Sequence, residues 1–239
     1  EKKTVRSTYH TVFKGALNPV IWCTQMHIPD GYLDLWSSLA TYALAGIYFI
    51  ASTKLKKLRL SPSEVSEATA LAALIFVAQM LNWPIPGGTS LHFVGGALAG
   101  IILGPFKGSL VIAIVLLVQC LVFHDGGITA LGANVINMAV IDVWAGYLVY
   151  RLAYKALSPR LGDAKSGFVG GLIGGWLGLT LAGIACGVEI GLSPSFPYGV
   201  FITVPIMGGW HAVLGVVEGV ITGLVVYYLK LRHPEVIKS

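Results

Sequence analysis

The sequence predicts an all-α protein that crosses a membrane repeatedly, a polytopic helical bundle of about seven transmembrane helices. Of its 239 residues, 55% are hydrophobic and 11% are charged, whereas soluble domains average about a quarter charged residues. Residues 35–53 and 108–124 contain no formal charge, and their lengths approach the ~20 residues that cross a bilayer. These stretches are too long and too uniformly apolar for the alternating strands of a membrane barrel, so helices are expected.

The apolar stretches place the seven expected spans. They are residues 35–53, 64–81, 92–103, 106–123, 129–150, 166–190 and 205–229. The third span is about half the length a bilayer requires, and the preceding PIPGGTSL at residues 84–91 cannot form regular helix. Irregular backbone persists at membrane depth only where it packs in protein or lines a cavity. His92 is therefore expected at the start of a half-length helix, on the floor of a pocket.

Basic residues predict the orientation of the bundle. They cluster at residues 54–59, at Lys107, at residues 151–165 and at residues 230–232, which are alternate connections between the spans. By the positive-inside rule these connections and the C-terminus are cytoplasmic. The basic residues follow no single face, so the net charge of +5 does not indicate a nucleic-acid partner. The remaining connections face outward, and four histidines lie in or beside them: His27, His92, His124 and His211.

The segment MHIPDGYLD at residues 26–34 offers metal-binding chemistry. If Met26 starts the mature chain, its amine, the His27 amide nitrogen and the His27 imidazole can close fused chelate rings around one ion. Another imidazole then completes a four-nitrogen set, which suits Ni(II), Cu(II) or square-planar Co(II) better than Mg or Ca. The competing interpretation is an interfacial turn, because Pro-Asp-Gly is common turn chemistry.

Four motifs in order resemble a known family. They are MHIPDGYLD, GGTSLHFVGGALAGIILGP at residues 87–105, HDGGITALGANVINMAV at residues 124–140 and HAVLGVVEGVIT at residues 211–222. The chain from Met26 onward is similar to the M-subunit (CbiM/NikM) family, the substrate-capture components of energy-coupling factor transporters for cobalt and nickel. The resemblance implies Ni(II) or Co(II) as transported substrate. It implies four ligands: the Met26 amine, the His27 amide and side chain, and the His92 imidazole.

The resemblance also implies partners and a location. The sequence has no phosphate-binding G-x-x-x-x-G-K-[ST] loop, so energy is expected from two ATPase subunits acting through a transmembrane coupling subunit, with or without a small accessory membrane subunit. The expected location is the cytoplasmic membrane, with the metal site facing outside. Ser37, Thr41 and Ala45 form a small-residue face that serves either docking of the coupling subunit or internal packing.

Residues 1–25 depart from the family pattern, because family members present Met-His at a free N-terminus. Lys14, Asn18 and Pro19 interrupt this segment, and it lacks a cleavage pattern, so it is a poor signal peptide. We expect translation to start at Met26, leaving residues 26–239 as a single transmembrane metal-capture domain. A retained extension would remove the amine ligand.

Five further residues are expected to support the ligands from a second layer: His124, Asp125, Asn134, His211 and Glu218. For each, a helix-end or purely structural role is the alternative. His211 and Glu218 share a helix face, and an ionisable residue within a span is a functional candidate by default. Asp142 also lies within a span, without a partner that the sequence identifies.

Two other functions remain as alternatives. A membrane-embedded metalloenzyme would use the same histidines, but the sequence has no H-E-x-x-H motif. A channel is disfavoured because no ring of like charges is evident. Cys23, Cys120 and Cys186 form no C-x-x-C pair, so neither a disulfide framework nor a thiolate metal site is expected.

Overall fold

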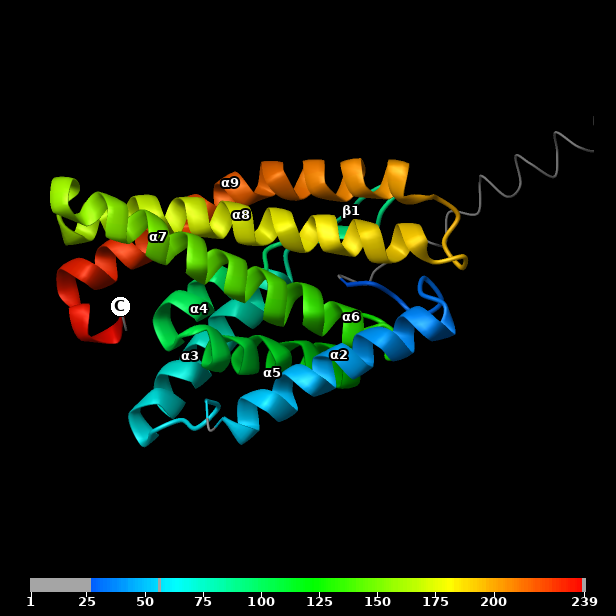
Figure 1. Ribbon diagram of the computed structural model, residues 1–239, viewed down its shortest axis with the longest axis horizontal. Helices are drawn as coiled ribbons and strands as arrows, with labels where there is room; N and C mark the ends of the chain where they lie inside the picture. Colours follow the sequence, from blue (N-terminus) through cyan, green and yellow to red (C-terminus); the bar gives the residue numbers. More distant parts are fainter. Residues whose placement is uncertain (1–26, 56, 238–239) are drawn as a thin grey trace, which may run out of the picture.

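The protein is a bundle of long helices whose axes lie roughly along one line, with a small hairpin among them (Figure 1). The computed structural model describes residues 27–55 and 57–237. The helices are α2 (Leu35–Lys54), α3 (Pro62–Gln79), α4 (Gly96–Leu103), α5 (Pro105–Phe123), α6 (Leu131–Asn134), the π-helix η1 (Val135–Asp142), α7 (Val143–Leu161), α8 (Asp163–Leu192), α9 (Val200–Arg232) and the short 3-10 helix η2 (Pro234–Val236). The strands are β1 (Asn82–Pro84) and β2 (Ser90–His92).

The described residues contain five helices that are long and apolar enough to cross a membrane. They are α2, α5, the continuous helix from Leu131 to Leu161, α8 and α9. The fold is therefore that of a helical membrane protein, but the expected count of seven spans is not confirmed. Helix α3 coincides with the second expected span, yet Glu64 and Glu67 in its first half make it less apolar than the others.

The third expected span is corrected by the structure. His92 ends a β-strand instead of starting a helix, and β1 and β2 pair antiparallel with Asn82 opposite His92. Residues 84–91 are non-helical, as expected. Helix α4 begins only at Gly96, after Gly95 adopts a φ of +73° that side chains with a Cβ disfavour.

Helices α8 and α9 pack closely through glycines. A Cβ atom added at Gly171 would lie 2.9 Å from the Cα atom of Gly223, and one added at Gly175 would lie 3.0 Å from the Cα atom of Gly219. Real Cβ atoms rarely approach backbone this closely, so glycine at these positions allows the short separation. Helices α8 and α9 are therefore held by backbone-to-backbone packing of small residues.

The small-residue face of α2 packs inside the protein. Thr41 and Ala45 are buried, and the Gly132 backbone lies against Thr41 and Tyr42. Ser37 is half-buried and donates to the Asp34 carboxylate at 2.5 Å. Internal packing therefore accounts for this face.

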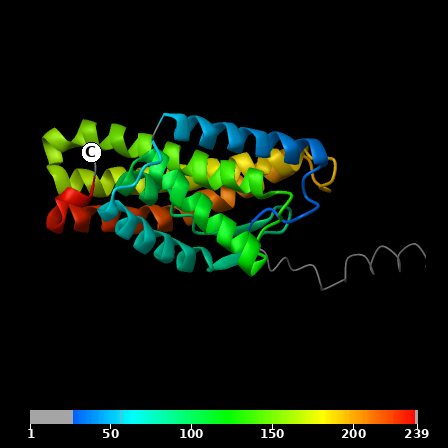
Figure 2. The ribbon, with the colours of Figure 1, turned by 90° about the horizontal axis from the view of Figure 1, so that it is seen from below.

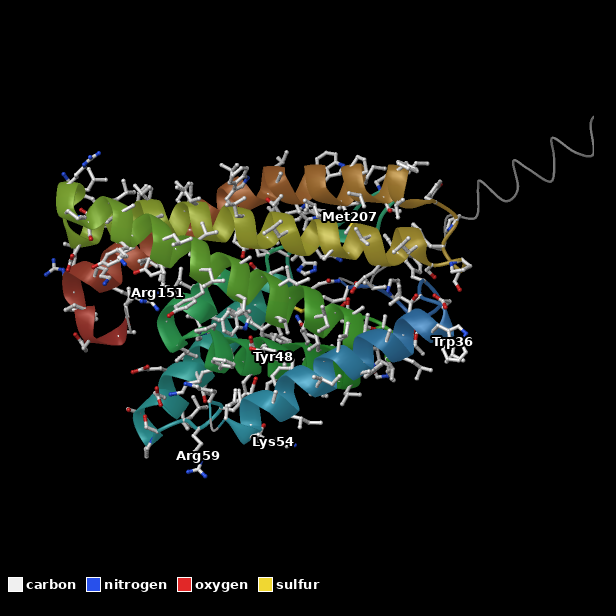
Figure 3. All side chains as sticks on the ribbon, in the orientation of Figure 1. Trp36, Tyr48, Lys54, Arg59, Arg151 and Met207 are labelled. Atoms are coloured by element: carbon white, nitrogen blue, oxygen red, sulfur yellow. The ribbon has the colours of Figure 1, made fainter. Side chains whose placement is uncertain are left out.

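The bundle is elongated and has two ends, which both views show (Figures 1 and 2). One end, which we call the site end, gathers residues 27–34, residues 124–130 and the α8–α9 connection. Arg59 and Arg151 lie in the opposite half of the molecule, whose far end we call the basic end, while Lys54 lies near the middle of the long axis (Figure 3). The C-terminal residues lie at the basic end (Figure 1).

Candidate metal centre

The segment that carries His27 is fastened to the last residue of α6, Asn134. The Asn134 side chain accepts a hydrogen bond from the Ile28 amide at 3.0 Å and donates to the Ile28 carbonyl at 3.2 Å. The Gly127 amide donates to the same carbonyl at 2.9 Å. These bonds fix the backbone directly after His27 without using the histidine side chain.

Two aspartates fasten the rest of this segment. The Asp30 carboxylate accepts from the amide and the hydroxyl of Thr129, at 2.7 and 2.5 Å. The Asp34 amide donates to the Ser193 hydroxyl at 3.0 Å, while its carboxylate caps α2 by accepting from the Trp36 amide at 3.1 Å. The Ser37 hydroxyl is the main group that holds the Asp34 pKa below its usual value. Residues 27–34 are thus tied to three other parts of the chain.

His92 is held with one ring nitrogen directed toward backbone. Its Nδ1 atom lies 2.8 Å from the Phe93 carbonyl oxygen, which can only accept, so Nδ1 carries the proton and Nε2 keeps its lone pair. The Glu218 carboxylate accepts hydrogen bonds from the Val94 and Gly95 amides, both at 2.9 Å. Glu218 therefore fixes the backbone that follows His92 from the middle of α9.

His27 and His92 meet in the interior although they are far apart in the sequence. Their ring centroids are 4.9 Å apart, with an interplanar angle of 81°. Both residues are buried, and His27 Nδ1 lies 3.7 Å from an Asp125 carboxylate oxygen. Burial lowers the pKa of His27 to about 4, while a hydrogen bond with the Asp125 backbone acts in the opposite direction. At neutral pH the imidazole is therefore uncharged, the form that binds metals.

The two histidines line a cavity of about 30 Å³ together with residues of η1, α8 and α9. Its lining is His27, Ile28, Thr89, Ser90, His92, Val94, Asn134, Asn137, Met138, Ala182, Gly183, Cys186, Met207 and His211. A water molecule needs about 10–15 Å³ of such volume. The cavity thus has room for an ion or one or two waters, and none for an organic metabolite.

The structure separates the sequence-derived candidates into groups. His27, His92, Asn134 and His211 line the cavity, and Asp125 lies beside His27. Glu218 does not line the cavity, and its carboxylate accepts a hydrogen bond from the Val94 amide in the backbone that follows His92. His124 is exposed at the end of α5, with a φ of 57°, and does not line the cavity. Met26 and residues 1–25 lie outside the described residues.

Several residues at the cavity were absent from the sequence-derived candidates. Asn137, Cys186 and Met207 line it, and Glu189 accepts a hydrogen bond from Asn137 at 2.6 Å. Glu189 had a readable signal, because it is an ionisable residue within an apolar stretch. Asp142 now has a structural role, since its carboxylate accepts from the Gly96 amide at 3.0 Å at the start of α4.

A bundle of membrane-length helices around an ion-sized cavity lined by imidazoles is the architecture of an ion-binding membrane protein. Comparison with known proteins identifies the family within this class. The family model described as "CbiM: Cobalt uptake substrate-specific transmembrane region" matches residues 27–236. The chain belongs to this family of metal transport proteins, and the resemblance found in the four motifs is confirmed.

Individual relatives agree with this assignment. The "Putative fused nickel transport protein NikMN" of Archaeoglobus fulgidus is 53% identical over 90% of this chain and 68% of its own length. The "Putative cobalt transport protein CbiM" of Halobacterium salinarum is 31% identical over 88% of this chain and 96% of its own. A solved structure titled "Crystal Structure of an Truncated Transition metal Transporter" superposes with a TM-score of 0.78 and 38% identity, covering 87% of this chain and 99% of that one. The relatives are transporters, so the metalloenzyme alternative is not favoured.

Proposed function

We propose that this protein captures Ni(II) or Co(II) in the cavity, as the substrate-binding component of an ATP-driven energy-coupling factor uptake transporter. The observation that carries the proposal is the meeting of His27 and His92, 4.9 Å apart by ring centroid, in a buried cavity of ionic size. Imidazole nitrogen suits late transition metals, whereas Mg and Ca prefer oxygen. Nickel and cobalt names among the relatives support the same class of substrate.

The proposed ligands are the Met26 amine, the His27 amide nitrogen, His27 Nδ1 and His92 Nε2. Bond connectivity requires Nδ1 at His27, because Nδ1 and the residue's own amide nitrogen close a six-membered ring with the metal. No group of three or more His, Cys, Asp or Glu side chains that could hold a metal is found within the described ranges. Backbone nitrogens therefore complete the set in this proposal, as a planar four-nitrogen site for Ni(II) or Co(II) requires.

The amine ligand requires that Met26 carry the free N-terminus of the working protein. We accordingly propose that residues 1–25 are absent from it, and that residues 26–239 form one metal-capture domain. Intact mass of the metal-loaded protein from its native membrane tests this proposal. A loaded protein that still carries residues 1–25 would contradict the amine ligand while leaving the two histidines in place.

We place the site end outside the cell and the basic end, with the C-terminus, in the cytoplasm. The support is the clustering of Lys and Arg in alternate connections of the sequence, with Arg59 and Arg151 in the half opposite the site end (Figure 3). The coupling subunit and two ATPase subunits then act on this chain, with or without an accessory membrane subunit. Cysteines introduced at the exposed positions Ser195 and Arg160 test the orientation, and impermeant reagents should label only the former.

The ligand assignment is tested by His92→Ala, with His124→Ala as the matched control. Calorimetric titration with nickel or cobalt should show loss of tight binding in the first variant, because the chelate loses its fourth nitrogen. The control should bind like the parent, because His124 is exposed and away from the cavity. Melting temperature verifies folding. Unchanged binding in His92→Ala would refute the assignment.

A further inference from the structure

The cavity has two walls of different origin. The first, which we call the loop wall, consists of His27, Thr89, Ser90 and His92, from the segment before α2 and from the hairpin. The second, the helix wall, consists of Asn137, Cys186, Met207 and His211, from η1, α8 and α9. The proposed ligands use only the loop wall and Met26, so the helix wall has no assigned role in metal binding.

His211 presents one ring nitrogen that is not engaged with its own helix. Its Nδ1 atom lies 2.7 Å from the Met207 carbonyl oxygen, one turn earlier in α9. A carbonyl oxygen only accepts, so Nδ1 carries the proton and Nε2 keeps its lone pair. His211 is buried and lines the cavity. The residue therefore supplies the helix wall with a nitrogen donor of fixed tautomer.

Asn137 presents an oxygen donor whose identity is fixed in the same way. Its Nδ2 atom donates to the Glu189 carboxylate at 2.6 Å, and a carboxylate acceptor requires that this atom be the amide nitrogen. The other terminal atom of the Asn137 side chain is therefore the oxygen Oδ1. Asn137 is 3% exposed, lines the cavity, and its Oδ1 has no hydrogen-bond partner within the described part of the chain. A buried acceptor in this state costs free energy unless a ligand satisfies it.

The sulfur atoms of the helix wall are already engaged. The Thr89 amide and hydroxyl lie 3.5 and 3.9 Å from the Met207 sulfur, and the same hydroxyl lies 3.9 Å from the Cys186 sulfur. These contacts make sulfur a poor first choice as a donor. The donors that remain are one imidazole nitrogen and one amide oxygen, with the Glu189 carboxylate behind the latter.

We propose that His211 Nε2 and Asn137 Oδ1 form a second, weaker position for a divalent transition-metal ion on the helix wall of the cavity. Glu189 orients the amide by accepting the hydrogen bond from Asn137 Nδ2. This inference rests on the proposed function and deepens it, because the ion passes between this position and the His27–His92 site. Two neutral donors bind more weakly than a four-nitrogen chelate, so the second position holds the ion only in transit.

The test uses the His92→Ala protein, in which the tight site is broken. Titration with cobalt chloride alone, followed by calorimetry and by the visible absorption of Co(II), should show residual weak binding. Adding His211→Leu or Asn137→Leu should abolish it, whereas the matched addition of His124→Ala should not. Adding Glu189→Gln, which keeps an acceptor for Asn137 Nδ2, should weaken the residual binding less than Asn137→Leu does.

The outcomes distinguish this inference from the proposed function. Tight binding in the His92→Ala protein would refute the tight-site assignment. An absence of residual binding in that protein, or residual binding unchanged by His211→Leu, would refute the second position alone. Melting temperatures of all variants separate misfolding from lost donors. In the parent background, His211→Leu should slow both association and dissociation of Co(II) while leaving the dissociation constant nearly unchanged, and unchanged rates would also overturn the proposal.

Discussion

The loop wall and the helix wall of the cavity are held in place by different forces. Residues 27–34 and the hairpin are short, non-helical segments, fixed by individual hydrogen bonds to Asn134, Thr129 and Glu218. Helices α8 and α9 each exceed the length of a membrane crossing and are held by close glycine packing. A few hydrogen bonds open at low free-energy cost, whereas packed helices open only with the whole fold.

This difference suggests how the protein combines stability with exchange of its cargo. The metal's proposed tight ligands come from the segments that open most easily, and the helices behind them stay fixed. Substitutions that disturb the packing of α8 against α9 should therefore change the stability of the fold, and substitutions around the loop wall should change metal binding first. Variants of the glycine packing, of the Ile28 anchor and of the α2 cap test this division.

The largest effect is expected from Gly175→Leu in α8. A side chain at this position would meet the Gly219 backbone, since even a Cβ atom lies 3.0 Å from its Cα atom. Overpacking of this kind costs about 3 kcal/mol or prevents folding, because the two helices must separate. Thermal unfolding in detergent measures the change.

Gly209→Leu in α9 is the matched control, because nothing lies within 4 Å of a Cβ atom added there. It should melt within a few degrees of the parent. Equal melting temperatures for the two variants would show that glycine packing does not hold the helix wall.

A smaller effect on the fold, with a larger one on metal binding, is expected from Asn134→Leu. The change removes both hydrogen bonds to Ile28 and leaves the segment after His27 less fixed. Loss of such a supporting contact typically costs 10- to 100-fold in metal affinity. Nickel titration measures it. Asn134→Asp keeps the acceptor for the Ile28 amide and should lose less, and a Leu variant that binds like the parent would show that the loop needs no such support.

The smallest effect is expected from Asp34→Ala at the start of α2. The variant loses the cap that accepts from the Trp36 amide, and we expect a melting temperature about 2–4 °C lower. Asp34→Asn retains a capping oxygen and is the control. Because Ser37 holds the Asp34 pKa below its ordinary value, the stabilisation by Asp34 is full above that value and declines as the pH falls through the lowered pKa. A parent-minus-Ala difference in melting temperature that grows on acidification would contradict this assignment.

Much of the fold was predictable because apolar length is a local property. Helices α2, α5, α8 and α9 coincide with long apolar stretches of the sequence. The connection expected at residues 151–165 is instead largely helix, since α7 continues to Leu161 and α8 begins at Asp163. The basic residues there mark the edge of the apolar region, which a helix can pass without ending.

The sequence predicts a site residue where the residue type itself indicates metal binding. It does not predict the parts of the site that depend on contacts between distant residues. His27 and His92 were candidates from their motifs, and the structure brings their rings together at the cavity. The hydrogen bonds of Glu218 to Val94 and Gly95 cross 124 and 123 residues of sequence, and no local pattern signals them. The sequence predicts that His92 starts a helix. The contacts that hold the chain near His92 in a non-helical conformation come from a distant residue and could not be seen locally. Asn137 was missed because an amide within a span carries no charge to attract notice.

The size of the cavity has a kinetic consequence. A volume of about 30 Å³ has room for an ion or for one or two waters, far less than an ion with its full hydration shell. In the proposed site, the ion must therefore exchange water for protein nitrogen as it arrives. Two divalent ions of equal charge and similar radius will then load at different speeds if their hydration shells exchange at different rates. Discrimination between nickel and cobalt would arise in the rate of loading as well as in the final affinity.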